Sequence, residues 1–240
     1  MLEWLIFTAL LIGAYLFGSI PLAYLLPKWT RGIDLRKYGS GNVGFTNVAA
    51  STSKWLAVPV LIFDLSKGAL AVFAAKWLGL SLPLQSLVGI AAVAGHNWPV
   101  FLNFNAGRGI LTTVGVALAL TPKAAVVLVL LSFTGIPFHL LSLTATICIF
   151  LLSVVTWFST LPPFDWLIGI SLGNQRLAMT LIFFTLWLLT PIRRITVPRS
   201  SLAKTVSTGS LIFNRFFFDR DIRDRKAWLT RTPEGEQQPK

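Results

Sequence analysis

The sequence has little of the chemistry that soluble enzymes usually carry. Its 240 residues include one cysteine, Cys148, and two histidines, His96 and His139. A single thiol excludes an internal disulfide and a cysteine-cluster metal site, and two histidines leave little material for a zinc site. Charged residues make up only 12% of the chain and hydrophobic residues 54%, which excludes a water-soluble globular fold. We therefore expect an all-α, polytopic integral membrane protein.

Long apolar runs support that expectation. A helix that crosses a bilayer needs about 20 apolar residues, and five runs approach or reach that length: Trp4–Leu26, Trp55–Leu80, Leu82–Leu102, Phe138–Phe158 and Leu177–Leu189. The first run is long and no basic residue precedes it, so we expect a membrane helix and not a cleaved signal. Between Gly109 and Pro137, the sequence Thr121-Pro122-Lys123 interrupts the apolar pattern. This segment forms either one kinked span or two short ones.

The distribution of basic residues predicts the orientation. Loop 28–54 contains five Lys and Arg residues, and the chain from Arg193 onward contains eleven, against five acidic residues. Cytoplasmic loops are enriched in Lys and Arg, so we expect both segments in the cytoplasm and the N-terminus outside. That requires an odd number of crossings: seven if the 109–137 segment forms two spans, which we favour, or five if it does not cross. The basic residues that give the net charge of +12 lie between and after the apolar runs, so they do not indicate nucleic-acid binding.

We expect two parts, a membrane-embedded domain over residues 1–197 and a basic cytoplasmic tail over 198–240. Between Leu211 and Leu229 the tail mixes apolar and basic residues. This pattern is compatible with a helix that lies on anionic lipid. A solvated, partly unfolded tail is the alternative.

The first basic loop contains the run Gly39-Ser40-Gly41-Asn42-Val43-Gly44-Phe45-Thr46-Asn47. Glycines let a backbone turn with its N–H groups pointing inward, which is how an anion-binding nest forms. The hydroxyl and amide side chains of Ser40, Thr46 and Asn47 add donors. Phe45 stands where a P-loop has lysine, and no strand precedes the glycines, so neither nucleotide-binding motif fits. The loop either binds phosphate or is a flexible turn.

A second polar segment reads Gly95-His96-Asn97-Trp98-Pro99, followed by Phe104-Asn105-Ala106-Gly107-Arg108-Gly109. The helix that begins after Gly109 favours anions at its N-terminus, and Arg108 can hold a phosphate through two hydrogen bonds. Arg108 as a simple interfacial anchor is the alternative. His96 fits a structural hydrogen bond as well as a catalytic role.

Asp64 and Lys67 are charged residues inside the second apolar run. Charges within a membrane are costly and usually pair or line a cavity. Residues three positions apart share one face of a helix, so the two side chains can pair with each other. They either stabilise the loops as a buried pair or contact a substrate.

Taken together, these motifs resemble the PlsY family of acyl-phosphate:glycerol-3-phosphate acyltransferases. The resemblance covers residues 13–120 and continues as a hydropathy profile to about residue 195. It implies a membrane enzyme of seven helices that uses no cofactor, neither metal nor coenzyme A. Such an enzyme transfers a fatty acyl group from acyl phosphate to the 1-hydroxyl of glycerol 3-phosphate, which yields lysophosphatidic acid for phospholipid synthesis in the cell membrane.

By position, the resemblance implies catalytic roles for Ser40 and His96. It implies phosphate-binding roles for Gly41, Asn42, Gly44, Thr46, Asn47, Lys67, Asn105, Gly107, Arg108 and Gly109. A serine nucleophile needs an adjacent base, and only His96 offers one, so we expect Ser40 to act as a hydrogen-bond donor to phosphate or oxyanion.

The sequence departs from the family pattern at three places. Ala50 stands where the first motif has arginine, Arg108 is the single cation of a second motif that has two, and the third motif near Pro191–Ile195 lacks its histidine and asparagine. Lys54, Arg193 and Arg194 are candidates to replace the lost charge. The alternatives are therefore a homologue with altered or lost acceptor binding and, from another class, a transporter or non-catalytic membrane protein.

Overall fold

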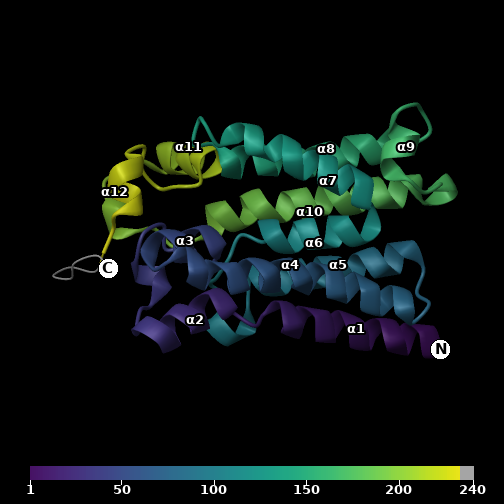
Figure 1. Ribbon diagram of the computed structural model, residues 1–240, viewed down its shortest axis with the longest axis horizontal. Coiled ribbons are helices and arrows are strands. Elements are labelled where there is room, and N and C mark those ends of the chain that lie inside the picture. Colours follow the sequence, from purple (N-terminus) through teal and green to yellow (C-terminus); the bar gives the residue numbers. More distant parts are fainter. Residues whose placement is uncertain (233–240) are drawn as a thin grey trace.

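The computed structural model describes residues 1–232, which form helices and no β-strand. The longer helices lie side by side along the long axis of the molecule (Figure 1): α1 Leu2–Gly18, α4 Lys54–Trp77, α5 Leu82–Asn97, α6 Ile110–Leu120, α7 Pro122–Ser132, α8 Leu141–Trp157 and α10 Arg176–Thr196. The remaining α-helices are α2 Leu22–Arg31, α3 Phe45–Ser51, α9 Phe164–Ile168, α11 Thr208–Phe218 and α12 Arg225–Leu229. Short 3-10 turns occur at Leu35–Lys37, Val100–Leu102, Phe133–Gly135, Gly173–Gln175 and Ser201–Ala203.

Within the described residues, three helical stretches are long and apolar enough to cross a membrane by length and composition: Leu2–Arg31, Lys54–Trp77 and Gly173–Thr196. Large apolar side chains such as Trp55, Ile62 and Leu181 are exposed on the outside of the bundle. Helices suit a bilayer because they satisfy every backbone hydrogen bond within one segment. The predicted all-α membrane class is confirmed. The first apolar run, however, is divided, because α1 ends at Gly18 and α2 begins after Pro21.

The ambiguous segment between Gly109 and Pro137 forms two helices, α6 and α7. The division falls at Thr121, and Pro122 occupies the first turn of α7. Proline is well suited to that position because the first N–H groups of a helix have no intrahelical acceptor. Helices α6 and α7 pack against each other and against α8. The segment between Gly109 and Pro137 is therefore two short helices and not one kinked helix.

Helices α4 and α6 approach each other closely through glycine. A Cβ atom on Gly68 of α4 would clash with the carbonyl oxygen of Thr112 on α6, and a Cβ on Gly115 of α6 would clash with the carbonyl oxygen of Leu65. The Thr112 hydroxyl also donates to the carbonyl oxygen of Asp64 at 2.9 Å. Small residues permit such backbone contacts between membrane helices. The turn of α4 that carries Asp64 and Lys67 is thereby fixed against α6.

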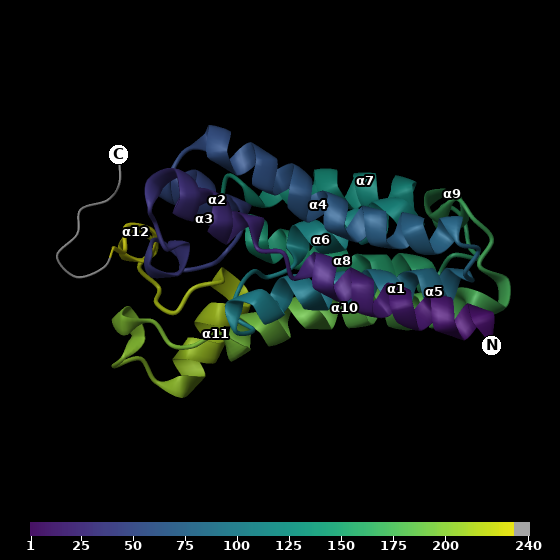
Figure 2. The same ribbon diagram turned by 90° about the horizontal axis from the view of Figure 1, so that it is seen from below.

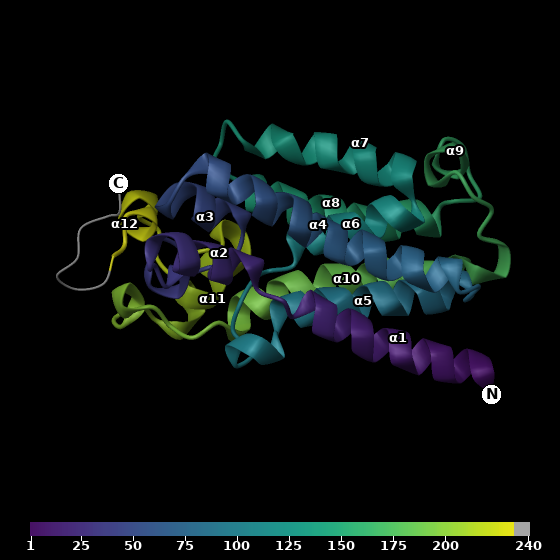
Figure 3. The same ribbon diagram turned by 60° about the horizontal axis from the view of Figure 1, so that its bottom comes forward.

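Helices α2, α3, α11 and α12 gather at one end of the bundle, and α9 and the N-terminus lie at the other (Figures 2 and 3). The predicted helix over Leu211–Leu229 is two helices, α11 and α12, because Asp219 adopts a left-handed conformation with φ of 59° after α11. The part of the tail beyond residue 232 lies outside the described residues.

Buried contacts hold the described part of the tail against α10. Arg215 donates to the carbonyl oxygens of Ile195 and Val197 at 2.8 and 2.6 Å, and to Asp221 Oδ1 at 2.8 Å. Burial alone would raise the pKa of Asp221, but hydrogen bonds from Arg215 and Ser200 outweigh it and lower that pKa below its usual 3.8. The ion pair is therefore formed at neutral pH, and α11 is anchored to the end of α10.

Candidate active site

The glycine-rich first loop is organised by the buried side chain of Asn47. Its amide nitrogen donates to the carbonyl oxygens of Leu35, Tyr38 and Asn42 at 3.3, 3.0 and 3.0 Å. Its amide oxygen accepts the N–H of Ser40 at 3.1 Å and the hydroxyl of Ser51 at 3.2 Å. Because these bonds use the hydrogen-bonding capacity of the amide, Asn47 positions the loop and has no group left for a phosphate.

The backbone N–H groups of residues 39–42 are also used within the protein. They donate, in chain order, to the carbonyl oxygen of Arg231, Asn47 Oδ1, the carbonyl oxygen of Tyr38 and Ser40 Oγ. The inward-facing nest predicted from the glycines is therefore not formed by these four residues. Side chains remain as ligands for an anion. Ser40 Oγ, which accepts from Asn42, keeps its own proton to donate, and Thr46 is exposed on α3.

The second loop is held by an arginine at the end of α10. The buried Arg193 donates from Nε to the carbonyl oxygen of Gly107 at 3.1 Å, and from Nη2 to Asn105 Oδ1 at 2.7 Å and the carbonyl oxygen of Ala106 at 3.3 Å. Gly107 lies against the ring of His96, where a Cβ would clash with Nε2. Gly109, with φ of 69°, leaves room for the amide oxygen of Asn97 in the same way. The loop thus closes over the end of α5.

Three ionisable side chains meet beneath this loop. Lys67 Nζ lies 3.0 Å from Asp64 Oδ1, and His96 Nδ1 lies 3.5 Å from the same oxygen. Asp64 and Lys67 are each 1% exposed and His96 is 8% exposed. The pair predicted from the i, i+3 spacing is present, and His96 joins it from α5. A carboxylate at Nδ1 fixes the orientation of an imidazole and directs Nε2 to the opposite side.

One residue of the first loop, Val43, and two of the second segment, Pro99 and Ala106, lie with this ionisable group around one small hollow. Ser19, from the segment that links α1 to α2, and Ala23, in the first turn of α2, contribute to its wall. Residues of α4, α5 and the two loops also line it: Val43, Asp64, Lys67, His96, Pro99 and Ala106. Across residues 1–232 no hydrogen bond joins Ser40 to His96, so the structure gives Ser40 no general base. The geometry favours Ser40 as a donor over Ser40 as a nucleophile.

Arg108 lies in a cluster of charges that sequence reasoning did not find. Its Nε is 2.6 Å from Asp219 Oδ1, and Arg194 Nε lies 3.4 Å from the same carboxylate oxygen. Arg194 is buried and also donates to Ser142 and Thr146 on α8. The acidic residues of an otherwise basic tail, such as Asp219, were the available signal for this contact. Lys54, in contrast, is exposed at the start of α4.

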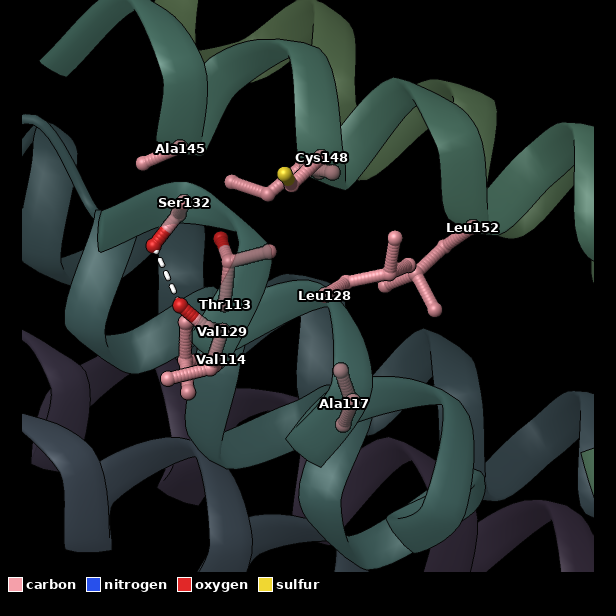
Figure 4. A pocket seen from close by; sticks show the side chains of 11 residues that line it. Thr113, Val114, Ala117, Leu128, Val129, Ser132, Ala145, Cys148 and Leu152 are labelled. Carbon is pink, nitrogen blue, oxygen red and sulfur yellow. Dashed lines mark hydrogen bonds between the residues drawn. The ribbon is translucent and has the colours of Figure 1, made fainter. Parts of the chain in front are cut away.

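A second, apolar pocket lies between α6, α7 and α8 (Figure 4). Its walls include Ala117, Leu128, Cys148 and Leu152, and the hydroxyl of Ser132 on its rim donates to the carbonyl oxygen of Val129 at 2.7 Å. None of the residues that line it also lines the hollow beneath the two loops. Cys148 is thus an apolar packing residue, and the pocket is separate from the candidate site.

Comparison with known proteins places this geometry in one family. The family model described as Glycerol-3-phosphate acyltransferase matches residues 8–198. Glycerol-3-phosphate acyltransferase 4 of Dehalococcoides mccartyi (strain CBDB1) is 42% identical over 226 residues, 94% of this chain and 94% of the relative. Glycerol-3-phosphate acyltransferase of Thermoanaerobacter pseudethanolicus is 42% identical over 153 residues, 62% of this chain and 77% of the relative.

A solved structure supports the same family assignment. The crystal structure of PlsY, an integral membrane glycerol 3-phosphate acyltransferase, in its glycerol 3-phosphate form has a TM-score of 0.65 and 31% identity, covering 78% of this chain and 88% of PlsY. Its lysophosphatidic acid form gives a TM-score of 0.62 at 28% identity, covering 78% and 87%. The family predicted from the three motifs is confirmed. This chain belongs to the glycerol-3-phosphate acyltransferase family.

Proposed function

We propose that this chain transfers a fatty acyl group from acyl phosphate to the 1-hydroxyl of glycerol 3-phosphate, yielding lysophosphatidic acid and inorganic phosphate for phospholipid synthesis. Family membership supports the acyl transfer and its acceptor. The observation that carries the proposal is the hollow where Val43 of the first loop and Ala106 of the second lie beside His96, Asp64 and Lys67. Two phosphorylated substrates need two sets of phosphate ligands around one reacting centre, and the two loops supply them.

The chemistry requires little covalent help from the protein. The hydroxyl oxygen of glycerol 3-phosphate attacks the acyl carbonyl carbon, and the bond between that carbon and the phosphate oxygen breaks. Phosphate leaves with the bonding electron pair, and the hydroxyl proton passes to His96 or to a substrate phosphate. Because an acyl phosphate has a good leaving group, orientation of the hydroxyl and stabilisation of the oxyanion supply most of the rate enhancement.

We assign roles to the site residues on this basis. Ser40 donates to a phosphate or to the oxyanion, and His96, oriented by Asp64, accepts the proton at Nε2. Lys67 pairs with Asp64, and Arg108 binds a substrate phosphate. Gly41, Asn42, Gly44 and Thr46 form the first phosphate loop, whose shape Asn47 holds, and Asn105, Gly107 and Gly109 form the second.

We further propose seven crossings of the cell membrane, with the N-terminus outside and residues 198–240 as a cytoplasmic tail. Both loops lie at the end of the bundle where the tail lies, and the N-terminus lies at the opposite end (Figure 1). This arrangement supports an odd number of crossings, with the hollow on the side rich in Lys and Arg.

The activity can be tested with purified protein in detergent, supplied with acyl phosphate and labelled glycerol 3-phosphate. We expect labelled lysophosphatidic acid and an equal amount of phosphate. Ser40→Ala and Arg108→Ala should each lower kcat/KM by on the order of a hundredfold, the effect of losing one donor to the developing charge. Thr8→Ala, on the exposed face of α1, serves as the control.

Failure to form lysophosphatidic acid, under conditions where another family member is active, would contradict the proposed activity. The same assay with other phosphorylated alcohols tests the alternative of a changed acceptor. Product from one of these, and none from glycerol 3-phosphate, would favour that alternative.

A further inference from the structure

The glycine-rich part of the first loop, residues 38–53, has no cationic side chain of its own. It contains neither lysine nor arginine, and the N–H groups of residues 39–42 are all used within the protein. A phosphate group carries up to two negative charges and is bound best by charge-assisted hydrogen bonds. If a phosphate binds at this loop, its countercharge has to come from another part of the chain.

The tail brings a guanidinium to this loop. Arg231 follows α12, which lies beside α3 at the loop end of the bundle (Figure 3). Its carbonyl oxygen accepts the N–H of Gly39 at 2.8 Å, and its Nη2 donates to the carbonyl oxygen of Arg36 at 3.3 Å. The guanidinium lies against Gly41, where a Cβ would clash with Nη2. Glycine at position 41 therefore makes room for this side chain as well as for the turn.

The guanidinium of Arg231 retains hydrogen-bonding capacity. Its Nε is buried and has no hydrogen-bond partner within residues 1–232. Burial lowers the pKa of Arg231, and the charge of Asp221 opposes that shift, but arginine stays cationic at neutral pH. The guanidinium stacks on the ring of Trp228, with 5.2 Å between its central carbon and the ring centroid. A partly buried cation with an unused donor is thus held in place beside the loop.

We propose that Arg231 binds a phosphate group of a substrate at the first loop, so that the segment after residue 198 completes the active site. The proposal rests on the proposed function for the identity of the substrates. Either glycerol 3-phosphate or acyl phosphate has the required chemistry. The segment lies beyond residues 8–198, which the family model matches, and it supplies a cation to a loop in which Ala50 stands where the family motif has arginine.

The side chain can be tested separately from the docking of the tail. Arg231→Ala removes the guanidinium, but it leaves the backbone bond to Gly39 and the buried ring of Trp228, which is 5% exposed. Arg231→Lys and Arg231→Gln distinguish charge from shape. Arg225→Ala removes an exposed arginine from α12 and is the matched control.

Kinetic measurements should vary each substrate while the other is saturating. We expect Arg231→Ala to raise the KM for one substrate by about ten- to a hundredfold, the effect of losing a charged hydrogen bond, with kcat within about threefold of the wild-type value. The substrate whose KM rises identifies the phosphate that is bound. Arg231→Lys should recover part of the loss, Arg231→Gln little of it, and Arg225→Ala should match the wild type.

Binding of inorganic phosphate, measured as a rise in Tm, tests the role of Arg231 without relying on catalytic turnover. Inorganic phosphate should raise the Tm of the wild type and of Arg225→Ala, but raise the Tm of Arg231→Ala and Arg231→Gln much less. An active wild type with unchanged KM values in Arg231→Ala would overturn the proposal and leave the proposed function intact. An inactive wild type would contradict the proposed function, and equal stabilisation of wild type and Arg231→Ala by phosphate would still overturn the role of Arg231.

Discussion

At the scale of single residues, several polar side chains around the hollow position other groups. Asn47 holds the first loop through its amide, and Arg193 holds the second loop through three acceptors. Buried polar groups of this kind are costly when one partner is removed, because the remaining donors and acceptors lose their hydrogen bonds without regaining water. The shape of both loops therefore depends on single side chains outside the reacting centre.

We expect Asn47→Ala to loosen the first loop. The substitution leaves the Ser40 N–H without its acceptor and the Asn42 carbonyl oxygen without its side-chain donor, at a cost of about 1–3 kcal/mol for each group that stays buried. Amide hydrogen exchange of residues 39–42 should become faster, and kcat/KM should fall by about tenfold or more. Ala50→Ser, exposed on the same helix, is the control. Unchanged exchange in the loop would show that Asn47 does not organise it.

At the scale of elements, the contact between α4 and α6 decides where the ionisable group lies. Gly68 follows Lys67 directly, and its contact with the backbone of Thr112 sets the rotation and depth of α4. His96 comes from the end of α5, which packs on α4. A shift of α4 would therefore separate Asp64 from His96, because the two residues belong to different helices.

Gly68→Ala should disturb this arrangement. The added methyl group meets backbone atoms of α6, which cannot move as a side-chain end can, and overpacking of this type costs about 1–3 kcal/mol. We expect a lower Tm in detergent and a reduced kcat. Gly13→Ala makes the same substitution on α1, where nothing lies within 4 Å of the added atom, and it should leave both quantities unchanged. Equal Tm values for the two variants would contradict the tight α4–α6 contact.

At the scale of the whole molecule, the C-terminal segment returns to the end that carries both loops. Arg215 joins α11 to the end of α10, Asp219 contacts Arg108, and Arg231 contacts the first loop. These contacts involve the helix ends and both loops. The position of the tail is therefore tied to the side of the membrane on which the hollow opens.

The proposed orientation can be tested with cysteine labelling. Cys148 is buried and is the only cysteine, so a Cys148→Ser background can carry single exposed cysteines at Glu3 and Arg223. A membrane-impermeant maleimide should label Glu3→Cys in intact cells and label Arg223→Cys only after the membrane is permeabilised. Labelling of Arg223→Cys in intact cells would place the tail, the loops and the hollow outside.

The sequence by itself determined the class, the family and the location of the polar loops. Apolar run length and composition report directly on whether a segment can be buried in lipid, so the helical membrane class could be derived from the sequence. The order of Ser40, Asp64 and His96 along the chain identified the family. The i, i+3 pair of Asp64 and Lys67 was also predictable, because a single helix fixes its geometry.

Only the tertiary structure decided which distant groups meet. The contact of Arg193 with Gly107 joins residues 86 positions apart, and that of Arg231 with Arg36 joins residues 195 positions apart. Local periodicity contains no information on such pairings, because they depend on how helices cross and on where the tail folds back. The same reason applies to the first loop. Its glycine content predicted N–H groups free to bind an anion, but Arg231 and Asn47 accept two of them and Tyr38 and Ser40 accept two others.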